Sequence, residues 1–286
     1  MEPTINLAYQ KREINLSKYS CLDKINWQRL TPGEEYDLEH FSRTEDIPFW
    51  IESARKYGSP ILEIGCGTGR ITIPLSCQGY RVYGIDRSDF MIQRLQDKLS
   101  KFPTSVQNKV KLVKEDMRNF KLNRKFPLVI CCFNTFLNLQ NGTDRQNFLS
   151  NIRNHLTING KFILDIVNPF MGNLAPAKNW KFEKENRLNE YFSKRYYKHL
   201  EHNKEQQVIK IKFKTLIFDK NLENINKWFF SYTTAYLNKD QTIKLLKENG
   251  FMIDNIYGNY DKTPFGKLKN PQTQLIICSK NNNGKR

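Results

Sequence analysis

The residues with the clearest chemical potential follow an apolar run that begins at residue 61. The segment ILEIGCGTGR, residues 61–70, places Gly65, Gly67 and Gly69 between a predicted strand and a predicted helix. Glycines at such a junction let the backbone turn tightly and approach a ligand closely. The dinucleotide fingerprint needs a further glycine where this chain has Arg70. A plain NAD site is therefore disfavoured.

Two carboxylates further along the chain extend the pattern. Asp86 ends the next apolar run, about 20 residues after Gly65, where an acidic side chain can accept both hydroxyls of a ribose. Asp116 follows a third apolar run and is suited either to cap a helix or to accept a hydrogen bond from an adenine amino group. Met117 would then pack on the adenine ring. Together with the glycines, these residues predict a ligand that carries a nucleoside.

The elements that must position these residues alternate along the chain. Apolar runs predict strands at 61–64, 82–85, 110–113, 128–133 and 162–167. Helices are predicted over 47–54, from about residue 70, from about residue 89 and around 148–155. The first 44 or so residues are polar and irregular. Strands that alternate with helices predict an α/β fold with a mostly parallel, doubly wound sheet.

A different pattern of period two occupies residues 171–237. In VIKIKFKTLIF, residues 208–218, apolar residues alternate with lysines, which predicts a strand with one buried and one wet face. WFFSYTTAYL (228–237) and YFSKRYYKHL (191–200) are predicted as its partners. A helix over 239–249 and two final apolar runs, FMIDNIY and QLIICSK, then close the main sheet with a hairpin.

Four segments are therefore expected. An N-terminal lid or helical segment at 1–58 precedes a Rossmann-like ligand-binding domain at 59–170 and 238–280. An antiparallel β subdomain is inserted at 171–237 and either covers substrate or forms a dimer interface. Residues 281–286 form a disordered tail.

Composition is that of a soluble globular protein, with 39% hydrophobic residues and a mean hydropathy of −0.65. We find no apolar stretch near the roughly 18 residues that a membrane-spanning helix needs, so we expect a cytoplasmic protein without membrane contact. The six cysteines include no C-x-x-C pair, which predicts free, mostly buried thiols. The net charge of +17 can attract polyanions, but Lys and Asn are spread along the chain, so nucleic-acid binding is not favoured.

In their order along the chain, these motifs resemble those of class I S-adenosylmethionine-dependent methyltransferases. ILEIGCGTGR resembles the glycine motif of that family, and GIDRSDFM, KEDM and PLVICCFNTF resemble the segments at its second, third and fourth strands. LTINGKFILDIVNP and LLKENGFMIDNIYGNYD extend the resemblance over roughly residues 36–280. It implies a seven-stranded sheet with its last strand antiparallel and S-adenosylmethionine across the carboxyl ends of the strands. One departure is Pro127, where the family usually has aspartate; proline is tolerated at a strand's first residue.

The resemblance also implies a set of cofactor-binding residues: Tyr36, Glu63, Gly65, Cys66, Gly67, Gly69, Asp86, Arg87, Met91, Asp116, Met117, Phe133 and Asn134. In this set Asp86 would hold the ribose and Asp116 the adenine amino group, with Met91 and Met117 on either side of the ring. Glu63 would orient the glycine loop.

The same resemblance assigns the remaining roles. Phe133 and Asn134 would line the reacting end of the cofactor, and Tyr36, in YDLEH, would belong to a lid. Methyl transfer from a sulfonium is an in-line displacement, so positioning and exclusion of water supply most of the catalysis. If the acceptor must lose a proton, the candidate bases are Tyr36, His40, Asn168 and Tyr232.

The acceptor is the least determined part. FNTF, residues 133–136, does not resemble the Asn/Asp-Pro-Pro-aromatic signature of enzymes that methylate exocyclic base amines. The leading hypothesis is an enzyme that methylates an oxygen or nitrogen of a small molecule. The alternatives are an RNA or protein methyltransferase that uses the basic insert, and a non-catalytic adenosyl-ligand-binding module. A homodimer through the insert is compatible with its aromatic residues, and no metal is expected, since alternation puts His199 and His202 on opposite faces.

Overall fold

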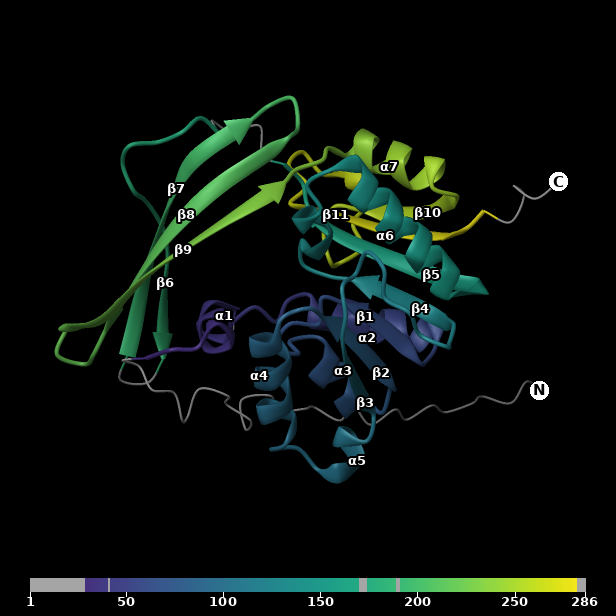
Figure 1. The fold of residues 1–286 in the computed structure, drawn as a ribbon, viewed down its shortest axis with the longest axis horizontal. Coiled ribbons are helices and arrows are strands. Elements are labelled where there is room, and N and C mark those ends of the chain that lie inside the picture. Colours follow the sequence, from purple (N-terminus) through teal and green to yellow (C-terminus); the bar gives the residue numbers. More distant parts are fainter. Residues whose placement is uncertain (1–28, 41, 170–173, 189–190, 282–286) are drawn as a thin grey trace, which may run out of the picture.

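The computed structural model describes residues 29–40, 42–169, 174–188 and 191–281 of the chain. These residues form a seven-stranded sheet in the order β10-β11-β5-β4-β1-β2-β3 and a four-stranded sheet in the order β6-β7-β8-β9. We call them the main sheet and the insert sheet. Figure 1 shows the insert sheet projecting to one side of the main sheet and its helices. The predicted α/β fold with an inserted antiparallel subdomain is confirmed.

The main sheet consists of β1 (Ile61–Ile64), β2 (Val82–Asp86), β3 (Val110–Lys114), β4 (Phe126–Cys131), β5 (Leu156–Val167), β10 (Phe251–Tyr257) and β11 (Thr273–Lys280). Strands β1 to β5 pair in parallel, whereas β11 runs antiparallel to both β5 and β10. The expected antiparallel last strand is therefore present. A register shift between β4 and β5 falls at Pro127, so the pairing of these strands does not need the N–H that proline lacks.

The helices are α1 (Pro32–His40), α2 (Ile47–Tyr57), α3 (Thr72–Cys77), α4 (Asp89–Leu99), α5 (Thr104–Gln107), α6 (Gly142–His155) and α7 (Lys239–Glu248), with 3₁₀ turns at η2 (Thr135–Asn138) and η3 (Phe265–Lys267). No helix in the described ranges is long and apolar enough to cross a bilayer.

Apolar clusters cover both faces of the main sheet. On one face Phe162 of β5 contacts Phe148 of α6 and Phe251 of β10, with ring centroids 6.1 and 5.7 Å apart. On the other face Trp50 and Ala54 of α2 pack over β1 and β4. Because the central strands are buried on both faces, their sequences are continuous apolar runs and do not alternate between apolar and polar residues.

Helix α1 corrects the prediction of irregular structure before residue 44. Thr31 and Glu34 form a capping box, in which the Glu34 N–H donates to Thr31 Oγ1 at 3.3 Å and the Thr31 N–H donates to Glu34 Oε2 at 2.8 Å. Pro32 occupies the first helical position, where its missing N–H costs nothing. The helix lacks an apolar stripe, which is why periodicity did not reveal it.

The insert sheet consists of β6 (Lys181–Leu188), β7 (Tyr191–Asn203), β8 (Val208–Phe218) and β9 (Asn224–Ala235). Strand β6 was not predicted, because its sequence KFEKENRL is mostly charged. In β8, Ile209, Phe213 and Ile217 are buried on one face, as the period-two pattern predicted.

One prediction about the insert sheet is wrong. A register shift between His199 and Glu201 inserts an extra residue, so His199 and His202 pair with Ile211 and Ile209 and lie on the same face. The bulge cancels the alternation on which the prediction rested.

The thiols of Cys66, Cys131, Cys132 and Cys278 are free and buried, and that of Cys77 is partly buried, as expected. Cys21 lies outside the described residues, as do residues 1–28 of the N-terminal segment and 282–286 of the predicted tail. Asn281, the first residue of that tail, donates its N–H to the Gly250 carbonyl at 2.9 Å.

A buried carboxyl joins β1 to α3. Glu63 is 3% exposed, and its Oε2 accepts a hydrogen bond from the Thr72 hydroxyl at 2.5 Å. Burial raises the pKa of Glu63 from 4.5 to about 8, opposed by the hydrogen bond from Thr72 and the charge of Arg70. Glu63 is therefore held largely neutral at pH 7.

This raised pKa predicts a pH-dependent stability. A carboxyl whose folded pKa exceeds its unfolded pKa contributes stability that is complete below about pH 4.5 and is lost as the pH rises through about 8. Glu63→Gln keeps the shape and removes the titration, so the free energy of unfolding of the variant, relative to wild type, should rise across this range. Urea denaturation over the range measures it, with the exposed Glu115→Gln as the control. An unchanged difference between variant and wild type would contradict the assignment.

Candidate active site

The glycine loop after β1 adopts left-handed backbone at Gly65, Gly67 and Gly69, with φ of 69°, 53° and 85°. A Cβ on Gly65 would lie 2.4 Å from Thr135 Cγ2, and one on Gly69 would lie 2.1 Å from Leu95 Cδ1. A Cβ on Gly67 would meet nothing within 4 Å. Packing therefore explains two of the glycines, while the middle one faces open space at the carboxyl ends of the strands.

Asp86 ends β2 beside this loop. Its Oδ2 accepts the Gly67 N–H and its Oδ1 accepts the Ser88 N–H, both at 2.9 Å. Each carboxylate oxygen can accept more than one hydrogen bond, so capacity for two hydroxyls remains. Ser88 also caps α4 through the Met91 N–H, and Arg87 is exposed.

Asp116 follows β3, on the neighbouring strand. The Nε and Nη2 atoms of Arg118 donate to its two carboxylate oxygens at 2.9 and 2.7 Å, and Arg118 also pairs with Asp144 at 3.2 Å. Hydrogen bonds from Arg118 lower the pKa of Asp116, and Met117 packs against the main core. An adenine amino group would therefore share this carboxylate with Arg118.

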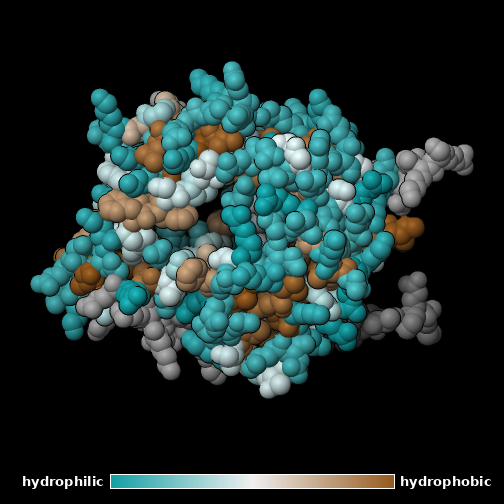
Figure 2. Space-filling view, viewed as in Figure 1, coloured by the Kyte–Doolittle hydropathy of each residue, from teal (hydrophilic) through white to brown (hydrophobic). Residues whose placement is uncertain are grey.

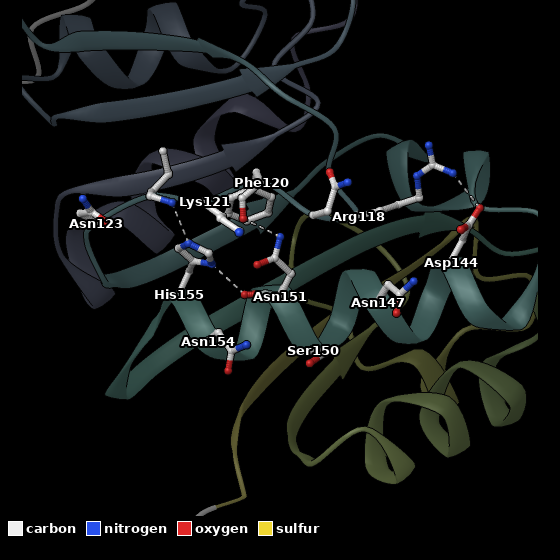
Figure 3. A pocket seen from close by; sticks show the side chains of 12 residues that line it. Arg118, Phe120, Lys121, Asn123, Asp144, Asn147, Ser150, Asn151, Asn154 and His155 are labelled. Atoms are coloured by element: carbon white, nitrogen blue, oxygen red, sulfur yellow. Dashed lines mark hydrogen bonds and ion pairs between the residues drawn. The ribbon is translucent and has the colours of Figure 1, made fainter.

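A groove of about 750 Å³ opens beside Arg118 and follows α6 (Figure 3). It ends at His155, whose ring accepts the Leu122 N–H at 3.1 Å and contacts the Asn151 carbonyl. Carboxamides supply much of its lining: Asn119, Asn123, Asn147, Asn151 and Asn154. Because His155 immediately precedes β5, the groove leads to the amino ends of the strands, away from the glycine loop.

The turn after β4 carries two non-glycine residues in left-handed conformation, Phe133 (φ 48°) and Asn134 (φ 65°). Hydrogen bonds to β5 hold it: the Phe133 N–H donates to Asp165 Oδ2 at 2.9 Å, and the Val167 N–H donates to Asn134 Oδ1 at 2.6 Å. Such backbone costs about 1–3 kcal/mol per residue and persists where the surroundings enforce it, often at functional sites. The turn places both residues at the carboxyl end of β4.

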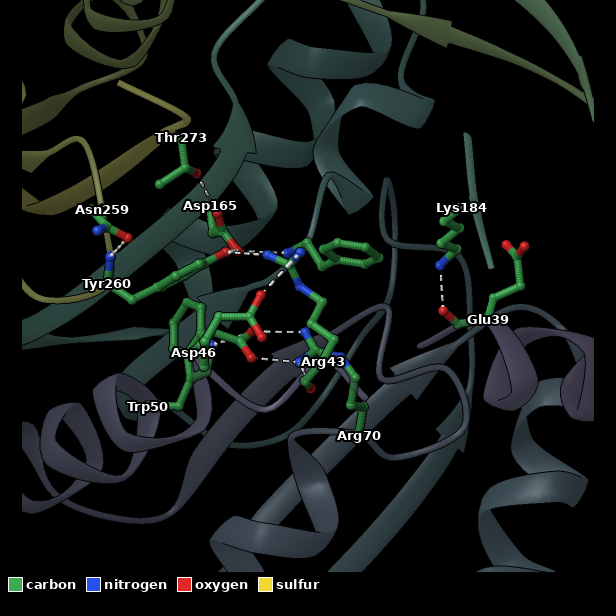
Figure 4. Close-up of polar contacts among 12 residues, drawn as sticks. Glu39, Arg43, Asp46, Trp50, Arg70, Asp165, Lys184, Asn259, Tyr260 and Thr273 are labelled. Carbon is green, nitrogen blue, oxygen red and sulfur yellow. Dashed lines mark hydrogen bonds and ion pairs between the residues drawn. The ribbon is translucent and has the colours of Figure 1, made fainter. Parts of the chain in front are cut away.

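Asp165 anchors this turn and was not singled out by sequence. It is 2% exposed and also accepts hydrogen bonds from the hydroxyls of Thr273 at 2.8 Å and Tyr260 at 3.0 Å. Burial raises the pKa of both Asp165 and Tyr260. The Tyr260 hydroxyl in turn accepts a bond from Arg43, whose guanidinium lies 4.5 Å from the centre of the Phe133 ring (Figure 4).

Arg70 binds Asp46 through two hydrogen bonds of 2.6 and 2.7 Å, and Asp46 is fully buried. Trp50 donates its indole N–H to the same carboxylate at 3.2 Å, and Arg70 also donates to the Arg43 carbonyl. Asp46 raises the pKa of Arg70 against the effect of burial. The residue that replaces the third glycine of a dinucleotide fingerprint thus ties the loop to α2.

Helix α1 lies against the glycine loop and α4. The buried Asp37 accepts a hydrogen bond from the Thr68 hydroxyl of the loop at 2.7 Å, and from Arg94 and Lys98 of α4 at 2.7 and 2.8 Å. Sequence reasoning named Tyr36 in this helix but missed Asp37, whose partners lie far away in the chain.

The four candidate bases occupy different surroundings. The His40 ring lies 4.5 Å from that of Tyr36 and 4.9 Å from that of Phe133, centroid to centroid. Burial and nearby cations lower the pKa of His40 to about 3, and burial raises the pKa of Tyr36 to about 12. Asn168 donates its amide to a backbone carbonyl before β11, and Tyr232 lies on β9 with a pKa raised by burial. Tyr36 and His40 are brought to the Phe133 turn.

The inner face of the insert sheet contacts α1. Lys184 donates to the Glu39 carbonyl at 2.5 Å and Asn186 to the Leu38 carbonyl at 3.3 Å, while Arg195 forms an ion pair with the Glu39 carboxylate. Arg195 is only 8% exposed. Figure 2 shows the molecule hollowed between the insert sheet and the α/β domain. The hollow lies beside α1.

The chain is similar in sequence to known methyltransferases. Residues 61–160 match the family described as a methyltransferase domain. The cypemycin N-terminal methyltransferase from Streptomyces sp is 30% identical over 142 residues, which are 49% of this chain and 56% of that protein. The chain spans about half the length of the curated relatives it matches first.

Solved structures are similar over nearly the whole described fold. The CcbJ methyltransferase from Streptomyces caelestis has a TM-score of 0.70 at 18% identity, over 84% of this chain and 97% of the other. CalS10, an amino pentose methyltransferase from Micromonospora echinaspora, has a TM-score of 0.63 at 16% identity, over 88% and 98% of the two chains. Residues 61–160 of the chain therefore match a methyltransferase domain, and the fold around them is similar to that of solved methyltransferases.

Proposed function

We propose that the protein transfers the methyl group of S-adenosylmethionine to an oxygen or nitrogen of a small molecule. The observation that carries this proposal is the convergence, at the carboxyl ends of β1, β2 and β4, of an open glycine loop, a carboxylate with free acceptor capacity and a strained turn. In open α/β sheets this edge is where ligands bind.

The residues present fit the cofactor. Open space at Gly67 admits the ribose and methionine portions, and Asp86 accepts the ribose hydroxyls. Asp116 accepts from the adenine amino group while Arg118 fixes its carboxylate, and Met91 and Met117 flank the ring. Cys66 contributes its backbone only, because its thiol is buried in a cluster with Ile73 and Leu95. When bound, the cofactor supplies an electrophilic methyl group.

The acceptor lies in the hollow between the insert sheet and α1, which serves as the lid over the cofactor. The inner face of the insert sheet beside α1 carries charged and aromatic side chains: Arg195 pairs with Glu39, and Tyr232 lies 5.9 Å from Phe213, centroid to centroid. We assign the insert sheet as the cover of this pocket. The relatives that are named an N-terminal and an amino pentose methyltransferase make a nitrogen acceptor the first to test.

Positioning supplies the catalysis. His40 is neutral at pH 7, but the burial that keeps it neutral also makes it a weak base. Tyr36 and Tyr232 keep their protons at that pH, because burial raises their pKa. These groups therefore orient the acceptor and exclude water, and an acceptor amine enters with its lone pair free.

Turnover is tested with methyl-labelled S-adenosylmethionine and an extract from the host, separated into small-molecule, nucleic-acid and protein fractions. The proposal predicts label in the small-molecule fraction. Label confined to nucleic acid or protein would overturn the acceptor class, and tight cofactor binding without label in any fraction would indicate a non-catalytic binding module.

Cofactor affinity depends on Asp86. Asp86→Ala removes the acceptor of the ribose hydroxyls, and hydrogen bonds to charged groups contribute about 1.5–3 kcal/mol, so the dissociation constant of S-adenosylmethionine should rise about 10- to 100-fold. Isothermal titration calorimetry measures it. Asp89→Asn, at the exposed start of α4, is the control and should bind as wild type does. Equal affinities for the two variants would place the ribose elsewhere.

Tyr260 affects the reaction without contacting the cofactor ribose. Tyr260→Phe removes the hydroxyl that links Asp165 to Arg43, which loosens the Phe133 turn. We expect the initial rate of label transfer at saturating cofactor to fall by about 10-fold or more, because small misplacements of reacting groups are costly. The affinity for S-adenosylmethionine should stay within about 2-fold. Tyr57→Phe is the matched control, and a rate equal to that of this control would remove the network from the mechanism.

A further inference from the structure

The outer face of the insert sheet, which points away from α1 and the cofactor loop, interleaves lysines with aromatic rings. Alternation separates this face from the buried inner one, which carries Phe213 and Arg195. We define the lysine–aromatic face by six residues on the preceding loop and on β7, β8 and β9: Trp180, Tyr196, Lys198, Lys212, Lys214 and Phe229.

The lysines of this face lie over rings. Lys214 Nζ is 4.5 Å from the centre of the Tyr196 ring and 5.1 Å from that of Trp180. Lys198 is 5.1 Å from the Trp180 ring, and Lys212 is 5.1 Å from that of Phe229. Cations at this distance are attracted to the faces of the rings. All three lysines are half-buried beside these rings.

The face has an excess of positive charge. Glu185 pairs with Arg187 and Glu201 with Lys210, at the margins of the sheet. Within the part of the chain that the structure describes, no carboxylate lies in ion-pair contact with Lys198, Lys212 or Lys214. The large aromatic Phe229 is 50% exposed among them. Cations without counterions beside the exposed ring of Phe229 and the half-buried ring of Trp180 match a partner that is both anionic and aromatic.

We propose that the lysine–aromatic face is a binding site for single-stranded nucleic acid, with bases stacked on Trp180 and Phe229 and phosphates paired with the three lysines. Stacking on aromatic side chains and pairing with basic ones is how proteins bind single strands without reading sequence. A duplex keeps its bases stacked on one another and cannot use the rings. Self-association through this face would oppose lysine with lysine, since a two-fold contact brings the same patch to itself.

This site is separate from the pocket for methyl transfer. Lys184 and Arg195 on the inner face contact α1, and α1 contacts the glycine loop, so a strand on the outer face lies across the sheet from the cofactor. The bound strand is therefore a docking partner and not the methyl acceptor. Binding of the strand on the outer face does not depend on which small molecule the α/β domain methylates.

The test is fluorescence anisotropy of a labelled oligodeoxythymidylate of about 15 nucleotides, measured over a series of salt concentrations with the full chain. A triple variant, Lys198→Gln with Lys212→Gln and Lys214→Gln, removes three cations from the face. Its control, Lys101→Gln with Lys125→Gln and Lys267→Gln, removes three exposed cations from the α/β domain, so both variants have the same net charge.

We expect wild type to bind with strong salt dependence, and the face variant to lower the slope of log affinity against log salt by about 2, since each phosphate contact contributes about 0.7. The control should change the slope far less. Trp180→Ala should weaken binding at least about 5-fold, with substantial rescue in Trp180→Phe, which keeps a ring. Unchanged affinity for S-adenosylmethionine verifies that each variant is folded.

Several results would overturn the proposal. One is that wild type does not bind the oligonucleotide at low salt. Another is that the two triple variants lose equal affinity for it, which would reduce the effect to net charge. A third is that the protein binds vesicles that contain phosphatidylserine but not the oligonucleotide. A wild-type dimer that the face variant converts to monomer would show instead that this face is a subunit interface.

Discussion

The buried ion pair between Arg70 and Asp46 is the interaction on which the site depends. It joins the glycine loop to the start of α2, and through the Arg43 carbonyl it reaches the segment after α1. Removing one partner of such a pair strands a charge in the interior and costs about 3–5 kcal/mol. The loop therefore keeps one shape before any ligand arrives, which lowers the entropy that binding must overcome.

The strained turn at Phe133 and Asn134 is positioned by the same region. Asp165 holds it from β5, Tyr260 holds Asp165 and Arg43 contacts both Tyr260 and the Phe133 ring. A chain of hydrogen bonds thus connects the two strand ends, β1 and β4, between which the cofactor would lie. Several independent donors to one carboxylate stabilise a turn that would otherwise relax.

Local patterns were enough to predict the main sheet and the place of the glycine loop. The glycines after residue 64, Asp86 and Asp116 follow apolar runs directly, so their places at the strand ends could be derived from spacing. The groups that hold them in place could not. Arg70 and Asp46 are 24 residues apart, and Tyr260 and Asp165 are 95 apart, so neither pair has a periodic signal.

Two elements, α1 and β6, were not predicted from the sequence, and each has a physical reason. Helix α1 begins with a readable capping box at Thr31 and Glu34, but its burial comes from Asp37 and Leu38 rather than from an apolar stripe. Strand β6 is charged because one of its faces pairs with α1 through Lys184. In both cases tertiary contacts outweigh the hydrophobic pattern.

The most direct measurement is a crystal structure of the protein with S-adenosylhomocysteine. We expect the ribose hydroxyls within hydrogen-bond distance of the Asp86 carboxylate, the adenine beside Asp116, and the sulfur directed toward the Phe133 turn beneath α1. A ligand bound elsewhere, as in the groove along α6, or a ribose without contact to Asp86, would contradict this expectation.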